Sequence, residues 1–423
     1  MNKHAQHSEH LHHHPHKKEQ KQDALILKGI IAVLGVILIV LVVSKLIVPG
    51  PRSPVRKLKN GDFELIIAGK PYFIKGVVYQ PIPIGQSHQY NFWADPNAPW
   101  LKDGQLMKEM GVNTVRFFQP GRDAAETKKL IHELYERFGI RTIMGNWMDY
   151  WRPGNYADEA YREDLTQRVL EMVKTYKDEE GILLWVLGNE NNLSWHSGAR
   201  ISWNCPEVRE VQDPYKQEMA KARIYYSLVN EIAGKIKKID PGRPVALGNS
   251  DIYSLEIAGE ACPNIDLVSL TAYRGKSFGN LWREVKRKID KPVLLMEFGC
   301  DSYNAKTNLE DQDIQVAFLK SQWQDIAGNM AGAGGEGNAI GGCIFEWSDE
   351  WWKHDEFMPA SWYAQDTVGD WSGGPYYYDI GAPNNMNMNE EWWGIVALSQ
   401  ELEGGLNKRI PRKSYNELQK LWR

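Results

Sequence analysis

The sequence has few cysteines and no strong excess of charge of either sign. Its 423 residues include four cysteines, which allow at most two disulfide bridges, and their spacing does not decide between disulfides and buried thiols. They are Cys205, Cys262, Cys300 and Cys343. The formal net charge of -4 supplies no broad positive field of the kind that a nucleic-acid-binding protein uses. We therefore exclude nucleic acid as a partner.

Two ligand-binding motifs are missing from the sequence as well. No G-x-G-x-x-G opens the first strand and helix unit, so an open, doubly wound dinucleotide-binding sheet loses its main support. The acidic C-terminal region contains no D-x-D-x-D-G calcium loop. We expect neither a bound metal nor a cofactor in the main domain.

Long apolar runs are absent except at one place near the N-terminus. Residues 29–44 carry no charge, and the KLIV that follows extends the run to about the twenty residues that a membrane-spanning helix needs. Four lysines precede the run, so the positive-inside rule places the N-terminus in the cytoplasm. These lysines are Lys17, Lys18, Lys21 and Lys28. The alternative is a cleaved signal peptide, although no clear small-x-small cleavage site follows the apolar core.

This pattern divides the chain into four parts. We predict a cytoplasmic His-rich tail over residues 1–28, a transmembrane anchor over 29–48, a stiff Pro-rich linker over 49–59 and an extracytoplasmic domain over 60–423. The His tract could bind a metal ion, but a solvated polar tail is the favoured interpretation. The predicted localisation is thus a single-pass membrane protein with its large domain outside the cytoplasm.

Aromatic residues are abundant, in contrast. The chain holds 17 Trp and 19 Tyr, many of them in C-terminal runs such as EWSDEWWKHDEF and GPYYYD. Most such side chains pack in cores, but aromatic faces beside Asp, Asn and Gly suit the mixed apolar and polar surface of a sugar ring. The composition therefore favours an oligosaccharide or polysaccharide as the substrate.

Eight short apolar runs alternate with amphipathic stretches, which is typical of a parallel sheet built from strand and helix units. The expected strands are residues 72–79, 113–118, 141–147, 183–189, 243–249, 265–273, 291–298 and 341–347. Eight such units in one domain predict a closed (β/α)8 TIM barrel of the α/β class. We expect residues 61–76 to form a hairpin that covers the bottom of the barrel, and residues 411–422 to form the last helix.

Polar and aromatic side chains gather at the ends of these strands, where (β/α)8 barrels place their active sites. The candidates are Arg116, Asn146, Trp147, Asn189, Glu190, Tyr273, Glu297, Glu346 and Trp347. Strands four and seven lie across the barrel from each other, so Glu190 and Glu297 can face one another. A retaining glycosidase needs two carboxyl groups about 5 to 5.5 Å apart, one as nucleophile and one as acid/base. We expect Arg116 and Tyr273 to converge on Glu297 and keep it ionised.

The same motifs resemble the retaining glycoside hydrolase superfamily of the clan A type. In that superfamily an Asn-Glu pair ends strand four and the nucleophile ends strand seven, which implies Glu190 as acid/base and Glu297 as nucleophile. The sequence is similar both to the catalytic domain of β-galactosidase and β-glucuronidase and to the cell-wall β-1,3-glucanosyltransferases. The resemblance implies that Arg116, Asn189 and Tyr273 bind substrate and that Trp347 forms a stacking platform. It also implies that Cys300 occupies a disulfide position.

The predicted function is retaining hydrolysis of a β-linked glycan through a covalent glycosyl-enzyme, with β-glucan transglycosylation as the alternative. A non-catalytic, membrane-tethered glycan-binding protein is a weaker alternative, because a binding site has no use for the full catalytic set. Trp147 and Asn146 are further candidates for substrate contact. Asp149, His196 and Glu346 are expected to be supporting or loop residues, and the long stretch from residue 348 to about 389 is expected to overlie the site.

Overall fold

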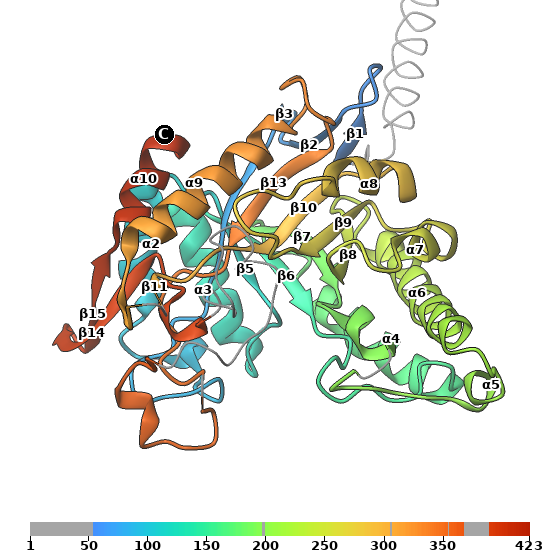
Figure 1. The fold of residues 1–423 in the computed structure, drawn as a ribbon, viewed down its shortest axis with the longest axis horizontal. Coiled ribbons are helices and arrows are strands. Elements are labelled where there is room, and N and C mark those ends of the chain that lie inside the picture. Colours follow the sequence, from blue (N-terminus) through green and yellow to red (C-terminus); the bar gives the residue numbers. More distant parts are fainter. Residues whose placement is uncertain (1–53, 197–198, 305–306, 354, 368–388) are drawn as a thin grey trace, which may run out of the picture. The chain divides into compact units, whose positions relative to one another are not determined.

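The computed structural model describes residues 54–196, 199–304, 307–353, 355–367 and 389–423. Eight parallel strands close into a barrel, so the predicted TIM barrel is confirmed (Figure 1). In chain order they are β4 (Ile74–Val78), β5 (Thr114–Phe117), β6 (Arg141–Asn146), β7 (Ile182–Leu187), β8 (Val245–Ser250), β9 (Leu267–Thr271), β10 (Val293–Phe298) and β13 (Ala339–Ile344). Each falls within one of the predicted apolar runs or overlaps it closely.

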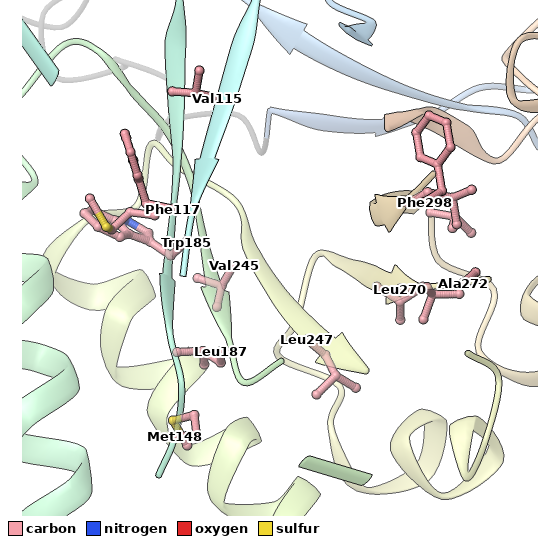
Figure 2. Packing of buried hydrophobic residues seen from close by; sticks show 14 of the residues in the cluster. Val115, Phe117, Met148, Trp185, Leu187, Val245, Leu247, Leu270, Ala272 and Phe298 are labelled. Atoms are coloured by element: carbon pink, nitrogen blue, oxygen red, sulfur yellow. The ribbon is translucent and has the colours of Figure 1, made fainter. Parts of the chain in front are cut away.

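The strands are buried on both faces because they separate two apolar layers. In β7, Leu184 and Val186 belong to the cluster inside the barrel, while Trp185 and Leu187 belong to the cluster between the barrel wall and the helices. Figure 2 shows part of this outer cluster, with Trp185 and Leu187 near Val245 of the neighbouring strand β8. Successive side chains therefore alternate between the two layers, although the strand sequence is a continuous apolar run.

Helices surround the barrel and begin and end at recognisable signals. They are α2 (Pro99–Met110), α3 (Ala124–Phe138), α4 (Glu159–Tyr176), α5 (Pro206–Arg209), α6 (Pro214–Ile239), α7 (Leu255–Ala261), α8 (Leu281–Lys288), α9 (Gln312–Gly328) and α10 (Lys413–Trp422). Aspartate side chains cap the N-termini of α3, α4, α6 and α9 by accepting backbone N–H groups. Helix α10, the predicted last helix, packs between α9 and α2 and closes the ring (Figure 1).

A small antiparallel sheet covers the end of the barrel where the strands begin. It consists of β1 (Val55–Lys57), β2 (Phe63–Ile67) and β3 (Lys70–Pro71), which confirms the predicted hairpin. Leu65 of β2 is 1% exposed and belongs to the same cluster as Ile74, Leu267 and Leu294 near the start of their strands. The sheet therefore plugs the bottom of the barrel and leaves the opposite end for the site.

The remaining elements are short and lie in the loops. Two further two-stranded sheets are β11 (Tyr303–Asn304) with β12 (Leu309–Glu310) and β14 (Val396–Glu403) with β15 (Leu406–Pro411). The 3₁₀ turns are η1 (Phe92–Ala94), η2 (Asn191–Trp195), η3 (Ser361–Tyr363) and η5 (Glu390–Trp392).

Three sequence expectations concern the cysteines and the N-terminal segment. All four cysteines are buried, and no disulfide joins them in the described chain. Of the two alternatives left open by the sequence, the structure therefore has buried thiols. The disulfide position implied for Cys300 by family resemblance is therefore wrong for this structure. The predicted tail and anchor, residues 1–48, lie outside the described residues. Within the part that the structure describes, no helix is long and apolar enough to cross a membrane.

Candidate active site

Glu297 lies at the end of β10 and is held by two side chains from other strands. Its Oε1 accepts a hydrogen bond from Arg116 Nη1 at 2.6 Å, and its Oε2 accepts one from the Tyr273 hydroxyl at 3.1 Å. The side chains of Arg116 and Glu297 are 1% and 7% exposed, so this is a buried ion pair. The register between β10 and β9 shifts between Leu295 and Glu297, so the regular pairing of the strand is interrupted just before the carboxyl. The predicted convergence on Glu297 is thus present.

Glu190 stands three residues after the end of β7 and directly before η2. The turn between them depends on Gly188, whose φ is +85°, a conformation that favours glycine. A Cβ atom at this position would lie 2.5 Å from the Tyr225 hydroxyl oxygen. The strand can therefore stop abruptly and present the next two side chains, Asn189 and Glu190, at the barrel mouth.

Two buried asparagines hold the turn that carries Glu190. The Asn191 side chain accepts from the Asn189 backbone N–H at 3.0 Å and donates to the carbonyls of Trp147 and Met148, each at 3.2 Å. The Asn192 side chain pairs with both backbone groups of Ser250, at 2.7 and 2.8 Å. The loop after β7 is therefore tied to the ends of β6 and β8 on either side.

The environment of Glu190 favours its protonated form. Burial among protein atoms and the negative charge of Glu297 raise the pKa of Glu190 to about 8, although a hydrogen bond from Ser250 acts in the opposite direction. The residue itself is only partly buried, so its carboxyl is crowded by protein and still open to the mouth. Two neighbouring carboxyl groups thus lie in different surroundings: Glu297 is paired with a cation, and Glu190 has no ion-pair partner among the described residues.

Asn189 shares the guanidinium of Arg116 with Glu297. Its Oδ1 accepts from Arg116 Nη2 at 2.7 Å, and the residue is 5% exposed. Because the amide oxygen faces Arg116, the amide NH2 is the end that remains to donate to a ligand. Arg116 also lies over the Phe118 ring, with its central carbon 4.3 Å from the ring centre. One arginine therefore orients four groups at the mouth: Glu297, Asn189, Phe118 and the Met296 carbonyl.

An aromatic row extends from Phe118 along the loop after β6. Trp147 stacks on Phe118 with ring centres 4.6 Å apart and planes 3° apart, and Tyr150 stacks beyond it at 6.1 Å. Burial and the charges of Glu190 and Glu297 raise the pKa of Tyr150. Trp147 is only partly buried, so it keeps some surface at the mouth.

Asn146 and Trp347, which were predicted to contact the substrate, have other contacts in the structure. The Asn146 side chain accepts from the Met148 backbone N–H at 2.9 Å and lies 3.9 Å from the Met172 sulfur, so it stabilises the loop after β6. The platform predicted at Trp347 is wrong: this side chain is 0% exposed and packs against Tyr415 of α10, in the layer between barrel and helices. The inward-facing ring beside it is Phe345, which contacts Trp393 at 5.4 Å.

The segment after β13 places a charged cluster beside the site. Glu346 and Glu350 are fully buried, and Lys353 lies 3.2 Å from Glu350 and 3.0 Å from Glu390. Burial and mutual repulsion raise the pKa of Glu346, and the charge of Glu390 contributes to raising that of Glu190. The described part of the predicted overlying loop therefore borders the site. Residues 354 and 368–388 of that loop lie outside the described residues.

The other candidates have supporting contacts. Asp149 accepts from Tyr161 and forms a two-point ion pair with Arg168 at 2.7 and 2.9 Å, so it braces the loop after β6. His196 lies 3.4 Å from Glu218 of α6. Among the described residues, no three His, Cys, Asp or Glu side chains gather in a way that could hold a metal ion.

Sequence reasoning missed four contributing residues, namely Tyr150, Ser250, Asn191 and Asn192. The asparagines follow Glu190 directly, and an N-E-N-N run after a buried strand is an available signal for a braced turn. Tyr150 lies in the loop after β6 among several other aromatic residues, so its sequence surroundings do not single it out. Nothing local distinguishes Ser250 from other strand-end serines.

The glucanosyltransferase family matches residues 52–330, more than half of the chain. The chain belongs to this family. Among curated proteins it is 24% identical over 319 residues to the 1,3-beta-glucanosyltransferase GAS5 of Saccharomyces cerevisiae, covering 70% of this chain and 57% of that protein. It is also 21% identical over 254 residues to a beta-galactosidase of Leuconostoc mesenteroides, covering 58% of this chain and 20% of that one. The chain thus spans little more than half of the first of these relatives.

Solved structures of two glycosidases share the barrel. A GH2 beta-galacturonidase from Eisenbergiella tayi superposes with a TM-score of 0.52 at 16% identity, over 87% of this chain and 53% of that chain. A beta-D-glucuronidase from Dictyoglomus thermophilum has the same TM-score at 15% identity, with the same coverage of both chains. At this identity the likeness shows the fold alone. Together with the family match, it identifies a clan A-like (β/α)8 glycoside hydrolase, as the resemblance implied.

Proposed function

We propose that this family member is a retaining enzyme that cleaves a β-linked glucan through a covalent glycosyl-enzyme. One observation carries the proposal: Arg116 and Tyr273 hydrogen-bond the carboxylate of Glu297, while burial and that same charge raise the pKa of Glu190 to about 8. A pair of carboxyl groups in opposite protonation states is what double displacement requires.

In the first step Glu297 attacks the anomeric carbon and the bond to the leaving oxygen breaks. Glu190 donates its proton to that oxygen, so the leaving sugar departs as a neutral alcohol. Arg116 and Tyr273, which both donate to the Glu297 carboxylate, orient it for the attack. In the second step Glu190, now a carboxylate, takes a proton from the incoming acceptor, whose oxygen replaces Glu297 on the anomeric carbon.

The neighbouring groups have roles in holding the reacting sugar. The amide NH2 of Asn189 is positioned to donate to a hydroxyl of that sugar, because its oxygen is occupied by Arg116. The partly exposed Trp147, braced by Phe118, offers an aromatic face nearby. No step requires a metal or a cofactor.

Family membership supports β-1,3-glucan as substrate and transfer as the outcome. The curated relative from yeast is named as a 1,3-beta-glucanosyltransferase, and transfer differs from hydrolysis only in whether a sugar or water is the second-step acceptor. We also propose an extracytoplasmic location for the domain, on the basis of the membrane anchor expected over residues 29–48. A purely glycan-binding role has less support, because it gives no reason for the Arg116 and Glu297 pair beside a carboxyl of raised pKa.

The test is to incubate residues 53–423 with β-1,3-, β-1,4- and β-1,6-linked gluco-oligosaccharides and to follow product masses. We expect products longer than the β-1,3-linked substrate, with retained anomeric configuration by proton NMR. Glu297→Gln and Glu190→Gln should each lower turnover by at least about a hundredfold. Glu64→Gln, on the hairpin at the opposite end of the barrel, is the matched control and should be unaffected. Inverted products, or unchanged turnover in Glu297→Gln, would refute the proposal.

A further inference from the structure

An ion pair joins the loops that follow β8 and β9, two neighbouring strands of the barrel (Figure 1). Asp251 directly follows β8, and Arg274 lies three residues after the end of β9. The guanidinium of Arg274 donates to both oxygens of the Asp251 carboxylate, from Nε to Oδ2 at 2.7 Å and from Nη2 to Oδ1. The side chains are 19% and 16% exposed, so the pair is largely shielded from water. A two-point contact of this kind fixes the relative orientation of the groups that it joins.

Each member of the pair stands next to a residue that bonds one of the two proposed catalytic carboxyl groups. Ser250, directly before Asp251, hydrogen-bonds the proposed acid, Glu190. Tyr273, directly before Arg274, donates to the proposed nucleophile at 3.1 Å. The ion pair therefore links the partner of the acid to the partner of the nucleophile.

Further hydrogen bonds build the pair into both loops. Asp251 has φ +45°, a left-handed conformation in which Asp and Asn are enriched, and its carboxylate also accepts from the Ile252 backbone N–H at 2.6 Å. Arg274 Nη1 donates to the Phe278 carbonyl at 2.9 Å and to Asn280 Oδ1 at 3.1 Å. The positions of the two loops consequently depend on each other.

A buried glutamine connects the same segment to the strand of the nucleophile. Gln322 of α9 is 0% exposed, and its Nε2 donates to the Gly275 carbonyl at 2.7 Å and to the Gly299 carbonyl at 3.1 Å. Gly275 directly follows Arg274, and Gly299 directly follows β10, the strand that carries Glu297. The loops after β8, β9 and β10 are therefore one connected support for the two carboxyl groups.

We infer that Asp251 and Arg274 are positioning residues, whose ion pair holds the partner of the acid and the partner of the nucleophile in one geometry. The inference rests on the proposed function, which assigns the two carboxyl groups their roles. The pair acts through its neighbours, so its loss should loosen Ser250 and Tyr273 together. A misplaced acid and nucleophile slow the chemical step itself, so kcat should suffer more than KM.

The test measures pH profiles of kcat/KM, with kcat and KM, on a β-1,3-linked gluco-oligosaccharide. Arg274→Met should lower kcat by at least about tenfold with a smaller change in KM. The Ser250 hydrogen bond lowers the pKa of Glu190, so weakening it should move the alkaline limb of the profile to higher pH, as expected for Ser250→Ala. Arg274→Lys keeps the charge and can make one of the two contacts, so it should restore part of the turnover.

Asp251→Asn separates the effect of position from the effect of charge. Asn tolerates the positive φ of this residue, and the substitution removes a negative charge, which by itself would lower the pKa of Glu190 and move the alkaline limb downward. Weakening of the Ser250 hydrogen bond moves the limb upward instead, and we expect the upward shift. A downward shift, or none, would overturn the positioning role. Three charged groups act directly on Glu190 and are unchanged in all of these variants: Glu297, Glu390 and Arg116.

Arg243→Met is the matched control. Arg243 is 18% exposed in its pair with Asp240, and it also donates to three backbone carbonyls near the end of the barrel where the strands begin. This variant should lose stability in urea denaturation, as Arg274→Met does, but it should keep kcat and the alkaline limb of the unmodified enzyme. Equal losses of kcat in the two variants, with no shift of the limb in either, would refute the positioning role.

Turnover that is lost in Glu297→Gln but unchanged in Arg274→Met would overturn the positioning role and leave the proposed function intact. If the unmodified enzyme turns over no glycan, the proposed function itself fails, and carboxyl 13C NMR then gives the pKa of Glu190 without substrate. The signal is assigned by its loss in Glu190→Gln. A higher pKa in Arg274→Met and Asp251→Asn than in Arg243→Met would retain the positioning role, and equal values would refute it.

Discussion

The centre of the site depends on how one arginine is shared. Arg116 is 1% exposed and binds Glu297 at 2.6 Å and Asn189 at 2.7 Å, so its charge is almost entirely neutralised within the protein. Removing one member of a buried ion pair leaves an uncompensated charge, which costs more than the pair itself contributes. The residues around Glu297 therefore act as one unit in stability as well as in the proposed chemistry.

We predict that Arg116→Met lowers the free energy of unfolding by about 3 kcal/mol, because it leaves the buried Glu297 carboxylate without its cationic partner. The double variant Arg116→Met/Glu297→Gln should recover part of this loss. Arg168→Met is the control, because Arg168 forms a partly exposed pair with Asp149 and should cost less than about 1 kcal/mol. Urea denaturation of the four proteins measures all of these values. A double variant as unstable as the single one would argue against the shared-charge interpretation.

The pKa of Glu190 predicts the alkaline limit of activity. The proposed acid must be protonated at the start of the cycle, so kcat/KM should be retained at low pH and lost as the pH rises through about 8. The Ser250 hydrogen bond lowers this pKa, so Ser250→Ala should move the alkaline limb to higher pH. A pH profile of kcat/KM for both proteins checks the shift. An alkaline limb that moves downward in Ser250→Ala would contradict the assignment of Glu190 as acid.

At the scale of elements, the turn after β7 sets where the acid stands. Strand β7 ends at Leu187, Gly188 turns at φ +85°, and η2 begins at Asn191, so the chain has three residues in which to leave the sheet. Asn191 and Asn192 then bind the ends of β6 and β8. This bracing explains how a single exposed turn can hold a catalytic side chain on the rigid barrel.

We predict that Gly188→Ala disrupts this turn. The left-handed conformation alone costs a non-glycine residue roughly 1 to 2 kcal/mol, and the added Cβ would also lie 2.5 Å from the Tyr225 hydroxyl. Gly139→Ala is the matched control, with φ +72° and no atom within 4 Å of the added Cβ. The Gly188 variant should lose at least about 1 kcal/mol more stability than the control, and kcat/KM should fall at least about tenfold as Glu190 shifts. Equal losses in urea denaturation and in activity would show that the turn is not specifically required.

On the scale of the whole molecule, the two ends of the barrel have different tasks. The hairpin β1 to β3 fills the end where the strands begin, with Leu65 buried among the first residues of the barrel strands. The opposite end carries the carboxyl pair, the aromatic row and the charged segment after β13. The residues described from 54 onward contain two large buried apolar clusters of their own.

We predict that residues 53–423 form a soluble enzyme with full activity on soluble oligosaccharides, while the whole chain fractionates with membranes through residues 29–48. Deletion of residues 29–48 should release the chain into the soluble fraction, and N-terminal sequencing should find the anchor uncleaved. Recovery of the whole chain in the soluble fraction, or a new N-terminus after residue 44, would refute the membrane anchor and favour a cleaved signal.

Local pattern was enough to predict the eight strands, the bottom hairpin, the last helix, and the gathering of Arg116, Asn189, Glu190, Tyr273 and Glu297 at one mouth. Alternation and apolar runs depend on neighbours in the chain, and parallel strands bring their carboxyl ends to one edge, so these features can be predicted from sequence. Sequence could not predict the burial of Trp347 against α10, the role of Asn146 in its loop or the stacking of Tyr150 on Trp147. These features depend on the direction in which each side chain points after its strand ends, and on which loop from elsewhere in the chain packs beside it. Both are fixed only when the barrel closes.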